Sequence, residues 1–187
     1  MLAYTIRSSF NTGEAPHLVI DVGKNQTKIA PAKPVPGSYW YVFLDVNNPK
    51  VKAKEYVVHG SQNSTVPPGL DADMSNPNYI FAIATHSLPI TWIPQGPLYD
   101  FFSKYGASRE LQKLEQFNAT IPCGGFNTLS YVFTSLGGPR TPPNPPPASY
   151  ELGRTDEIPA VLMMSLMAQA NGKGPYSIMD SYTWTSP

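Results

Sequence analysis

Charged side chains are scarce in this chain of 187 residues. Asp, Glu, Lys and Arg make up only 14% of it, well below the quarter or so that is usual in globular domains. Thirteen basic residues balance thirteen acidic ones, so the formal net charge is zero. No net positive field would hold such a molecule on a nucleic-acid backbone or on an anionic membrane. We therefore expect no nucleic-acid partner.

Cysteine is almost absent. Cys123 is the only one, so the chain cannot form an internal disulfide, and a chain of this length can build a core without one. Residues 1–5 carry neither a basic region nor a continuous apolar region, so we expect no Sec-type signal in this chain. Both observations suit a cytoplasmic protein and one exported by another route, and they leave the compartment open.

Long apolar runs are missing as well. The longest, at 39–44 and 160–164, are far shorter than the roughly 20 residues of a membrane-spanning helix, so we expect no integral membrane segment. The three histidines do not have the spacing of a zinc site, and no phosphate-binding glycine loop is present. We expect no metal and no cofactor.

Proline and glycine, in contrast, are abundant, with 21 and 14 residues. They break long helices and favour short strands joined by turns. Apolar and polar residues alternate at 2–7, 17–22 and 129–134, which is typical of half-buried strands, and apolar runs at 39–44 and 79–85 are typical of central ones. Residues 161–184 predict a terminal hairpin with a turn at 171–174. The chain is predicted to be mainly β with a small helical part, a β-sandwich of antiparallel or mixed sheets forming one globular domain over residues 1–187.

Helices are expected only within residues 97–117. Pro97 suits the first position of a helix, and Leu98, Phe101 and Phe102 then fall on one face. Ser108 can cap a second short helix. The sequence therefore predicts one or two short helices that pack on a sheet.

The remaining segments are predicted as turns and connectors. A turn at 47–49 begins a hairpin whose return strand, 51–58, places Lys50, Lys52 and Lys54 on one solvated face that protects an edge. Residues 60–77 are predicted as a long loop. The proline-rich stretch 139–147 is a stiff connector, with an SH3-type ligand as the alternative.

Read in order, four stretches resemble a known domain type. They are Tyr4-Thr-Ile-Arg-Ser8 with Leu18-Val-Ile-Asp21, Gly37-Ser-Tyr-Trp-Tyr-Val-Phe-Leu-Asp45, Asn78-Tyr-Ile-Phe-Ala-Ile-Ala-Thr85, and Leu129-Ser-Tyr-Val-Phe-Thr-Ser-Leu-Gly-Gly138. Their order resembles the ILEI-type domain of interleukin-like secreted proteins and of the stem of an O-mannose-linked N-acetylglucosaminyltransferase. The resemblance implies a compact β-sandwich with helices at one side and a non-enzymatic role in carbohydrate recognition or signalling.

The chain departs from that family at its polar positions. His86-Ser-Leu88 replaces the acidic pair after the strand, and Thr128-Leu129 replaces an Arg-Asp pair before the aromatic strand. The family's polar sugar-binding groups therefore do not carry over, and its disulfides cannot form with one cysteine. Tyr131 keeps the family's aromatic residue, so the resemblance implies a binding role at this position.

Candidate binding residues lie in two loops and beside them. Trp92 sits between prolines in the segment 86–96, where a stiffly held indole can stack on a sugar face or on an apolar patch; the alternative is that it fills the core. Asn63, in the loop 60–77, supplies an amide. We predict Trp92, Tyr131, His86 and Asn63 as ligand-binding residues.

These observations favour a non-catalytic recognition domain, lectin-like in its use of loop aromatics, with a glycan or a protein as its partner. The alternative is a self-assembling or host-interacting, toxin-like component that forms homo-oligomers. A third hypothesis is a hydrolase with Cys123 as nucleophile and a histidine as base, but no family signature surrounds the cysteine. Asp71 and Asp73 are predicted to lie in a solvated turn rather than in a cation site.

Overall fold

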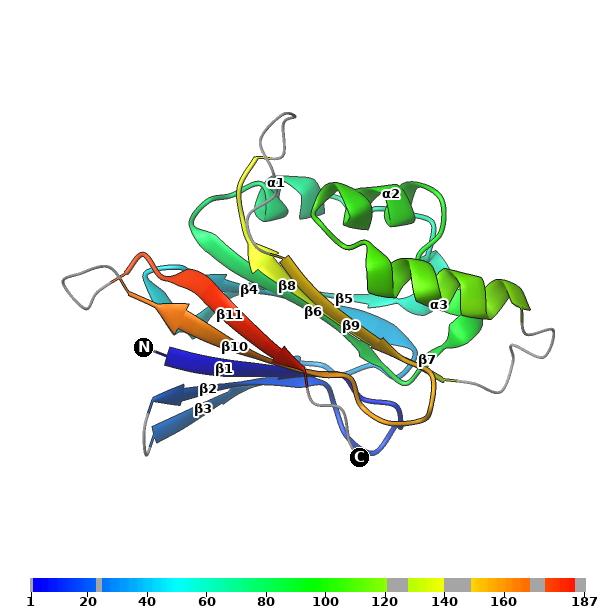
Figure 1. Cartoon of the computed structure of the whole chain (residues 1–187), viewed down its shortest axis with the longest axis horizontal. Helices are drawn as coiled ribbons and strands as arrows, with labels where there is room; N and C mark the ends of the chain where they lie inside the picture. The colour runs from blue at the N-terminus through cyan, green and yellow to red at the C-terminus, as the bar shows by residue number, and fades with distance from the viewer. Residues whose placement is uncertain (1, 23–24, 121–127, 140–148, 169–173, 184–187) are drawn as a thin grey trace.

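The computed structural model describes residues 2–22, 25–120, 128–139, 149–168 and 174–183. These residues form three α-helices and eleven β-strands, stacked as three layers (Figure 1). A five-stranded sheet lies against one face of a six-stranded sheet, and the helices cover the other face. The predicted mainly β architecture, with two facing antiparallel sheets and a small helical part, is confirmed. Cys123 and residues 140–147 of the predicted connector lie outside the described residues.

The five-stranded sheet has the order β11-β10-β1-β2-β3, and all its pairings are antiparallel. Its strands are β1 (Leu2–Arg7), β2 (His17–Val22), β3 (Asn25–Ile29), β10 (Val161–Met167) and β11 (Ser177–Thr183). Alternate residues of β1 lie on opposite faces of this sheet. Tyr4 and Ile6 are fully buried on the inner face, whereas Thr5 and Arg7 on the outer face are half-buried. The predicted terminal hairpin is confirmed as the pair β10 and β11, although most of its turn lies outside the described residues.

The six-stranded sheet has the order β5-β4-β6-β8-β7, with β9 paired to β8. Its strands are β4 (Ser38–Asp45), β5 (Asn48–His59), β6 (Tyr79–His86), β7 (Leu88–Pro89), β8 (Thr128–Leu136) and β9 (Ser149–Arg154). Strand β4 is apolar on both sides, as predicted for a central strand. Trp40 and Val42 pack toward the other sheet, whereas Tyr41 and Phe43 pack toward the helices.

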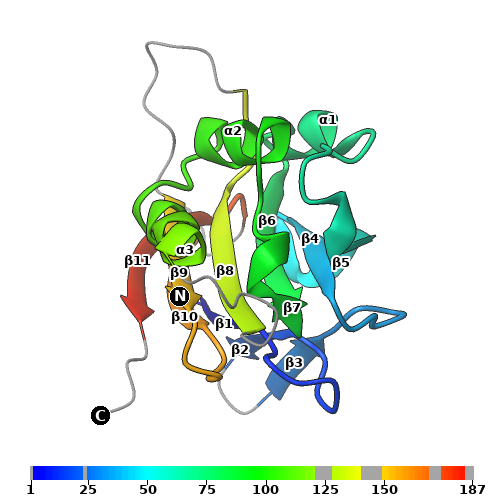
Figure 2. The same cartoon turned by 90° about the vertical axis from the view of Figure 1, so that its right-hand side faces the viewer.

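The helices are α1 (Leu70–Met74), α2 (Pro97–Lys104) and α3 (Arg109–Thr120), with 3-10 turns η1 (Gly60–Gln62) and η2 (Ile90–Trp92). Figure 2 shows all three α-helices on one face of the six-stranded sheet. The predicted pair within 97–117 is confirmed, and Phe102 of α2 makes edge contacts with Tyr39 and Tyr41, with ring centroids 6.3 and 6.2 Å apart. None of the described helices is long and apolar enough to cross a membrane.

Helix α1 was not predicted, because the segment 60–77 has no helical period. A single turn needs only two inward residues, and Leu70 and Met74, four apart, are both fully buried. Asp71 and Asp73 belong to this helix rather than to a turn. Each is held by a lysine, with Lys104 Nζ 2.7 Å from Asp71 Oδ1 and Lys54 Nζ 2.7 Å from Asp73 Oδ2.

Strand β5 is an edge strand, as predicted, but its lysines do not share one face. The pairing with β4 shifts so that Phe43 lies opposite Lys54 and Leu44 lies opposite Lys52, which leaves Ala53 as the extra residue of a β-bulge. The two lysines therefore point to opposite sides of the sheet. Lys54 reaches Asp73 under the helices, whereas Lys52 donates to the Ala30 carbonyl on the other side.

The two sheets are joined by polar contacts as well as by their shared apolar core. Tyr4 of β1 and Thr134 of β8 place their hydroxyl oxygens 2.5 Å apart, and Thr134 Oγ1 donates to the Phe81 carbonyl at 2.8 Å. Beyond β1, the Ser9 amide donates to the Thr85 carbonyl of β6 at 2.9 Å. The link after β1 thus crosses from one sheet to the other.

Candidate functional site

Two of the four predicted binding residues meet at the corner where η1 and η2 lie together. We call this site the Trp92 corner; its members are Gly37, His59, Gly60, Asn63 and Trp92. The Asn63 side-chain amide donates to the Ile93 carbonyl at 2.9 Å, and the Gln95 amide donates to the Asn63 carbonyl at 2.8 Å. Asn63 therefore holds the two loops in register.

The indole of Trp92 lies directly against two glycines. A Cβ atom at Gly60 would come within 2.7 Å of Trp92 Cε3, and one at Gly37 within 3.0 Å of Trp92 Cζ3. Gly37 also has a φ of +73°, a conformation that favours glycine. The Trp92 carbonyl accepts a hydrogen bond from the Tyr39 hydroxyl. Both the ring and the main chain of Trp92 are thus fixed before any ligand arrives.

His59 stands beside this indole at the surface. Its ring centroid is 4.9 Å from that of Trp92, with an interplanar angle of 57°, and the residue is exposed. His59 Nδ1 accepts from the Ser61 amide at 3.3 Å and lies 2.8 Å from Ser61 Oγ, and the tautomer in which Nδ1 accepts both bonds carries its proton on Nε2. The corner therefore combines a half-buried indole with an exposed imidazole whose Nε2 can donate.

The corner has the chemistry of a neutral, amphipathic binding surface. Trp92 is half-buried, and within the described part of the chain its Nε1–H has no hydrogen-bond acceptor. An amphipathic ring with an available donor suits a ligand that offers both an apolar face and hydroxyl or carbonyl acceptors. The exposed neighbours are hydroxyls and amides. They are Ser61, Gln62, Thr91 and Gln95.

Tyr131, by contrast, belongs to the core. The side chain is fully buried among the residues beneath the helices, and its hydroxyl donates to Glu151 Oε2 at 2.8 Å. Burial raises the pKa of Tyr131 well above its usual value, and the Glu151 carboxylate acts in the same direction. The sequence could not separate this role from a binding role, because an aromatic residue on a central strand suits either one.

His86 is also buried, with an exposed fraction of 2%. Neither ring nitrogen has a hydrogen-bond partner among the described residues. Burial lowers the pKa of His86, and the nearby Val35 main chain acts in the opposite direction. His86 therefore lies beneath the surface and, in this conformation, offers no group to a ligand in solvent.

The described residues offer no metal centre: they contain no group of three or more His, Cys, Asp and Glu side chains placed to share an ion. The Cys123 hypothesis rests on a residue outside the described ranges. Sequence reasoning named His59 only as a candidate base for Cys123, and it did not predict His59 or the two glycines of the Trp92 corner as ligand-binding residues. Their signal is weak, because each is a single residue at a strand end and follows no period. No protein-family model and no curated protein matches this chain.

Proposed function

We propose that this chain is a non-catalytic recognition domain that binds an uncharged, carbohydrate-like ligand at the Trp92 corner. The observation that carries the proposal is the fixed, half-buried indole of Trp92, whose Nε1–H has no acceptor among the described residues, beside the exposed His59 ring. Rigid aromatic groups bind at low entropic cost, because little side-chain freedom is lost when the ligand arrives.

A sugar suits this surface better than a charged ligand. A pyranose ring has an apolar face that can lie on an aromatic ring, and its hydroxyls can accept from Trp92 Nε1 and His59 Nε2. The low charge of the whole chain, 14%, is consistent with a neutral ligand.

A glycan-array screen tests the proposal, with wild type, Trp92→Ala and His59→Ala compared at equal concentration. Val51→Ala is the matched control, since Val51 is 48% exposed on β5 and is not a member of the corner. We expect specific signals that fall at least about tenfold, roughly 1.4 kcal/mol, in both corner variants and persist in the control. Signals that survive in folded Trp92→Ala would refute this site.

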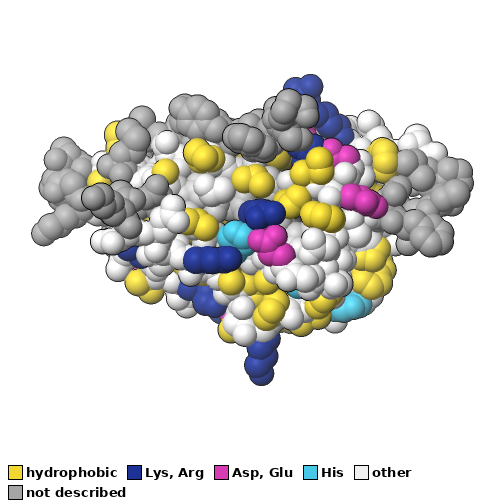
Figure 3. Space-filling view, turned by 90° about the horizontal axis from the view of Figure 1, so that it is seen from below, with side chains coloured by type: hydrophobic (Ala, Val, Ile, Leu, Met, Phe, Trp, Pro, Cys, Tyr) yellow, Lys and Arg dark blue, Asp and Glu magenta, His cyan; other side chains and the backbone are white. Residues whose placement is uncertain are grey.

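Self-assembly is the second candidate function, and a separate observation favours it. On the outer face of the five-stranded sheet, Met163 and Met167 are 46% and 43% exposed. Met163 lies opposite Thr5, which lies opposite Val19, so an uncharged row crosses three strands. Figure 3 shows apolar side chains spread over this face, with a few charges among them. Contiguous exposed apolar patches mark interfaces, whereas single exposed apolar residues do not, so this row is the candidate contact on the outer face.

Mass photometry on a dilution series tests assembly. If this face pairs with itself, wild type forms a discrete oligomer and Met163→Glu returns it to the monomer mass, because a buried carboxylate would have no partner. Val51→Glu, a matched change on the other sheet, should leave the oligomer intact. A wild type that stays monomeric at all concentrations would rule out this second function.

A further inference from the structure

A groove of about 440 Å³ runs between α3 and β9, apart from the Trp92 corner. Its helical wall consists of Glu110, Lys113, Leu114 and Phe117, which follow the spacing of one helix stripe. Its other wall is the continuous segment 152–156. The first three residues of this wall, 152–154, belong to β9, and consecutive strand residues point to opposite faces, so a groove lined by all three lies along the edge of the strand.

That edge of β9 has no partner strand in the part of the chain that the structure describes. Within the described residues β9 pairs only with β8, so the groove side has no neighbouring strand. The Gly153 amide points away from β8, because it lies 3.4 Å from Glu110 Oε2 of α3. Main-chain groups alternate along an antiparallel strand, so those of Glu151 also point toward the groove side.

The groove carries no unpaired charge. Lys113 Nζ lies 2.6 Å from Glu110 Oε1, and Arg154 pairs with Asp156 at 2.5 Å. The two acidic and two basic groups therefore neutralise one another. Leu114 and Phe117 supply apolar surface between them, so an occupant without charge fits best.

Gly153 brings the helix and the strand edge close together. A Cβ atom at this position would lie 2.5 Å from Leu114 Cδ1, so a larger residue here would force the Leu114 side chain to shift. A free strand edge beside a helix stripe is the arrangement in which an extended peptide adds as a further strand, with the main chain giving affinity and alternate side chains filling the groove.

We propose that the edge of β9 and the facing stripe of α3 form a docking site for an extended, uncharged peptide of another protein. The peptide pairs in the antiparallel or parallel sense with the main chain of Glu151 and Gly153, and its alternate apolar side chains contact Leu114 and Phe117. In the free protein the Glu110 carboxylate accepts the hydrogen bond of the Gly153 amide, and a peptide carbonyl must replace it there. Glu110 therefore competes with the peptide.

The test uses fluorescein-labelled peptides of about eight residues, in which Val, Leu or Phe alternates with Ser or Thr, and fluorescence anisotropy with the whole chain. Each binding peptide is compared with a copy N-methylated at alternate residues, which keeps the side chains and removes the main-chain donors of one edge. Phe117→Asp and Glu110→Ala are compared with Gln112→Asp, an exposed position on α3 that does not line the groove. Circular dichroism checks that each variant is folded.

We expect N-methylation and Phe117→Asp each to weaken binding at least about tenfold, Glu110→Ala to strengthen it, and Gln112→Asp to leave it unchanged. The absence of binding by any alternating peptide would overturn the proposal, as would equal binding of the N-methylated copies. An oligomer of the chain alone that Phe117→Asp dissociates would also overturn it, and would assign the edge to a second copy. None of these results depends on the Trp92 corner, so this proposal and the proposed function can fail separately.

Discussion

At the scale of single residues, the Trp92 corner depends on two glycines, Gly37 and Gly60, because the indole lies where their side chains would be. Gly60 has no room for a methyl group, because a Cβ atom there would lie 2.4 Å from Leu88 Cδ1 and 2.9 Å from the Gly37 carbonyl oxygen. The carbonyl cannot move without breaking its hydrogen bond from the Gly60 amide, which is 2.7 Å long. The indole therefore keeps its position only while this residue stays glycine.

We expect Gly60→Ala to lower the free energy of unfolding by about 1–3 kcal/mol, since overpacking forces neighbouring atoms to shift. Urea denaturation measures the change. The matched control is Gly13→Ala, where the nearest atom to a new Cβ, Asn11 Oδ1, lies at 3.6 Å, and where we expect almost no loss. Equal stabilities for the two variants would show that the close packing at Gly60 is wrong.

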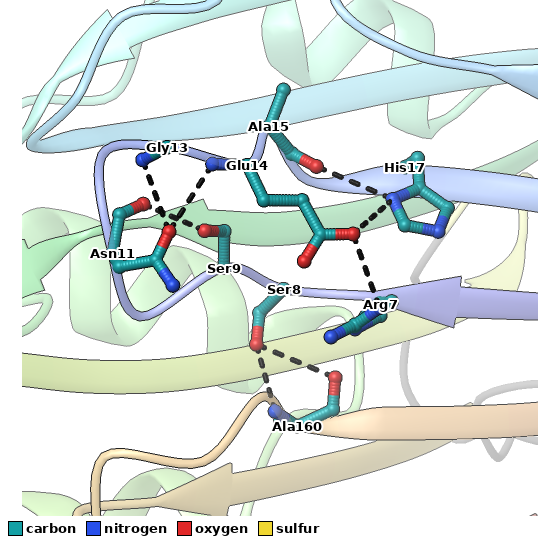
Figure 4. A network of polar contacts seen from close by, with 9 residues as sticks. All are labelled: Arg7, Ser8, Ser9, Asn11, Gly13, Glu14, Ala15, His17 and Ala160. Carbon is teal, nitrogen blue, oxygen red and sulfur yellow. Dashed lines mark hydrogen bonds and ion pairs between the residues drawn. The ribbon is translucent and has the colours of Figure 1, made fainter.

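Two histidines make the fold sensitive to acid. Burial lowers the pKa of His86 below its ordinary 6.5, and burial together with the charges of Lys28 and Arg7 lowers that of His17, against the opposing Ala15 carbonyl and Glu14 carboxylate. Figure 4 shows His17 beside Glu14, which also pairs with Arg7 at 3.1 Å. Folding therefore favours the neutral form of both rings.

Because the unfolded chain takes up these protons first, the contribution of the two histidines to stability is fully present above pH 6.5 and is lost as pH falls from that value through the lower folded pKa values. We expect His86→Leu to flatten part of this slope, since it removes a buried group that cannot be protonated without a partner. Unfolding midpoints between about pH 7.5 and 5 measure the slope. If His86→Leu leaves the slope unchanged, His86 does not titrate as its burial requires.

At the scale of elements, helix α3 is fixed by a residue far from it in the sequence. The Glu151 carboxylate of β9 accepts from the main-chain amides of Ser108 and Glu110, each at 2.8 Å, and of Leu111 at 3.3 Å. A negative charge at a helix N-terminus satisfies unpaired amides and interacts favourably with the helix dipole. Glu151 thereby ties α3 to the edge strand and to Tyr131.

We expect Glu151→Ala to destabilise the protein by about 1–3 kcal/mol, because it leaves the buried Tyr131 hydroxyl and the first amides of α3 without their acceptor. Hydrogen exchange should increase first at the start of α3. Gln112→Ala, on the exposed side of the same helix, serves as the control. Unchanged protection at Ser108 to Leu111 in the Glu151 variant would contradict this role.

Some of the helices and strands could be predicted from the sequence, and others could not. The periodic strands 2–7 and 17–22 and the helix beginning at Pro97 could be predicted, because side-chain alternation and helix stripes are local patterns. Helix α1 could not, since one turn is too short to show a period. The bulge at Ala53 was equally invisible, because it arises from the pairing of two strands, and it separates lysines that strict alternation would place together.

At the scale of the whole molecule, the six-stranded sheet is the middle layer, which packs against the five-stranded sheet on one face and against the helices on the other. The hydroxyls of Tyr4 and Thr134 meet inside the inter-sheet core, where burial raises the pKa of Tyr4 above its usual range. Such a buried polar pair fixes how one sheet sits on the other, because sliding would leave both groups unsatisfied.

We expect Tyr4→Phe to lower the free energy of unfolding by about 1 kcal/mol, a modest loss because Thr134 keeps its bond to the Phe81 carbonyl. Thr134→Val should cost more, since it leaves both the Tyr4 hydroxyl and the Phe81 carbonyl without this partner. Thermal unfolding of the two variants measures the difference. The reverse order would show that Tyr4, rather than Thr134, is the centre of the contact.

The candidate site could be predicted only in part, for reasons that belong to this scale. Trp92 and Asn63 lie in loops that the fold brings together, and prolines around Trp92 were a usable local signal. Tyr131 and His86 lie on strands, and the sequence does not show which elements cover each face of those strands. It therefore could not show that both side chains are buried. His59 joins the corner only because β5 ends beside η2, which is a tertiary contact.

The most direct test of recognition at the Trp92 corner is the ¹H–¹⁵N NMR signal of the Trp92 indole Nε1–H, assigned with Trp92→Phe and followed during titration with neutral disaccharides. Trp40 is an internal control, because its fully buried indole donates to Glu55 at 2.9 Å. We predict a saturable shift of the Trp92 signal with at least one sugar while the Trp40 signal stays fixed. A Trp92 signal that no sugar moves, or that moves only together with Trp40, would contradict binding at this corner.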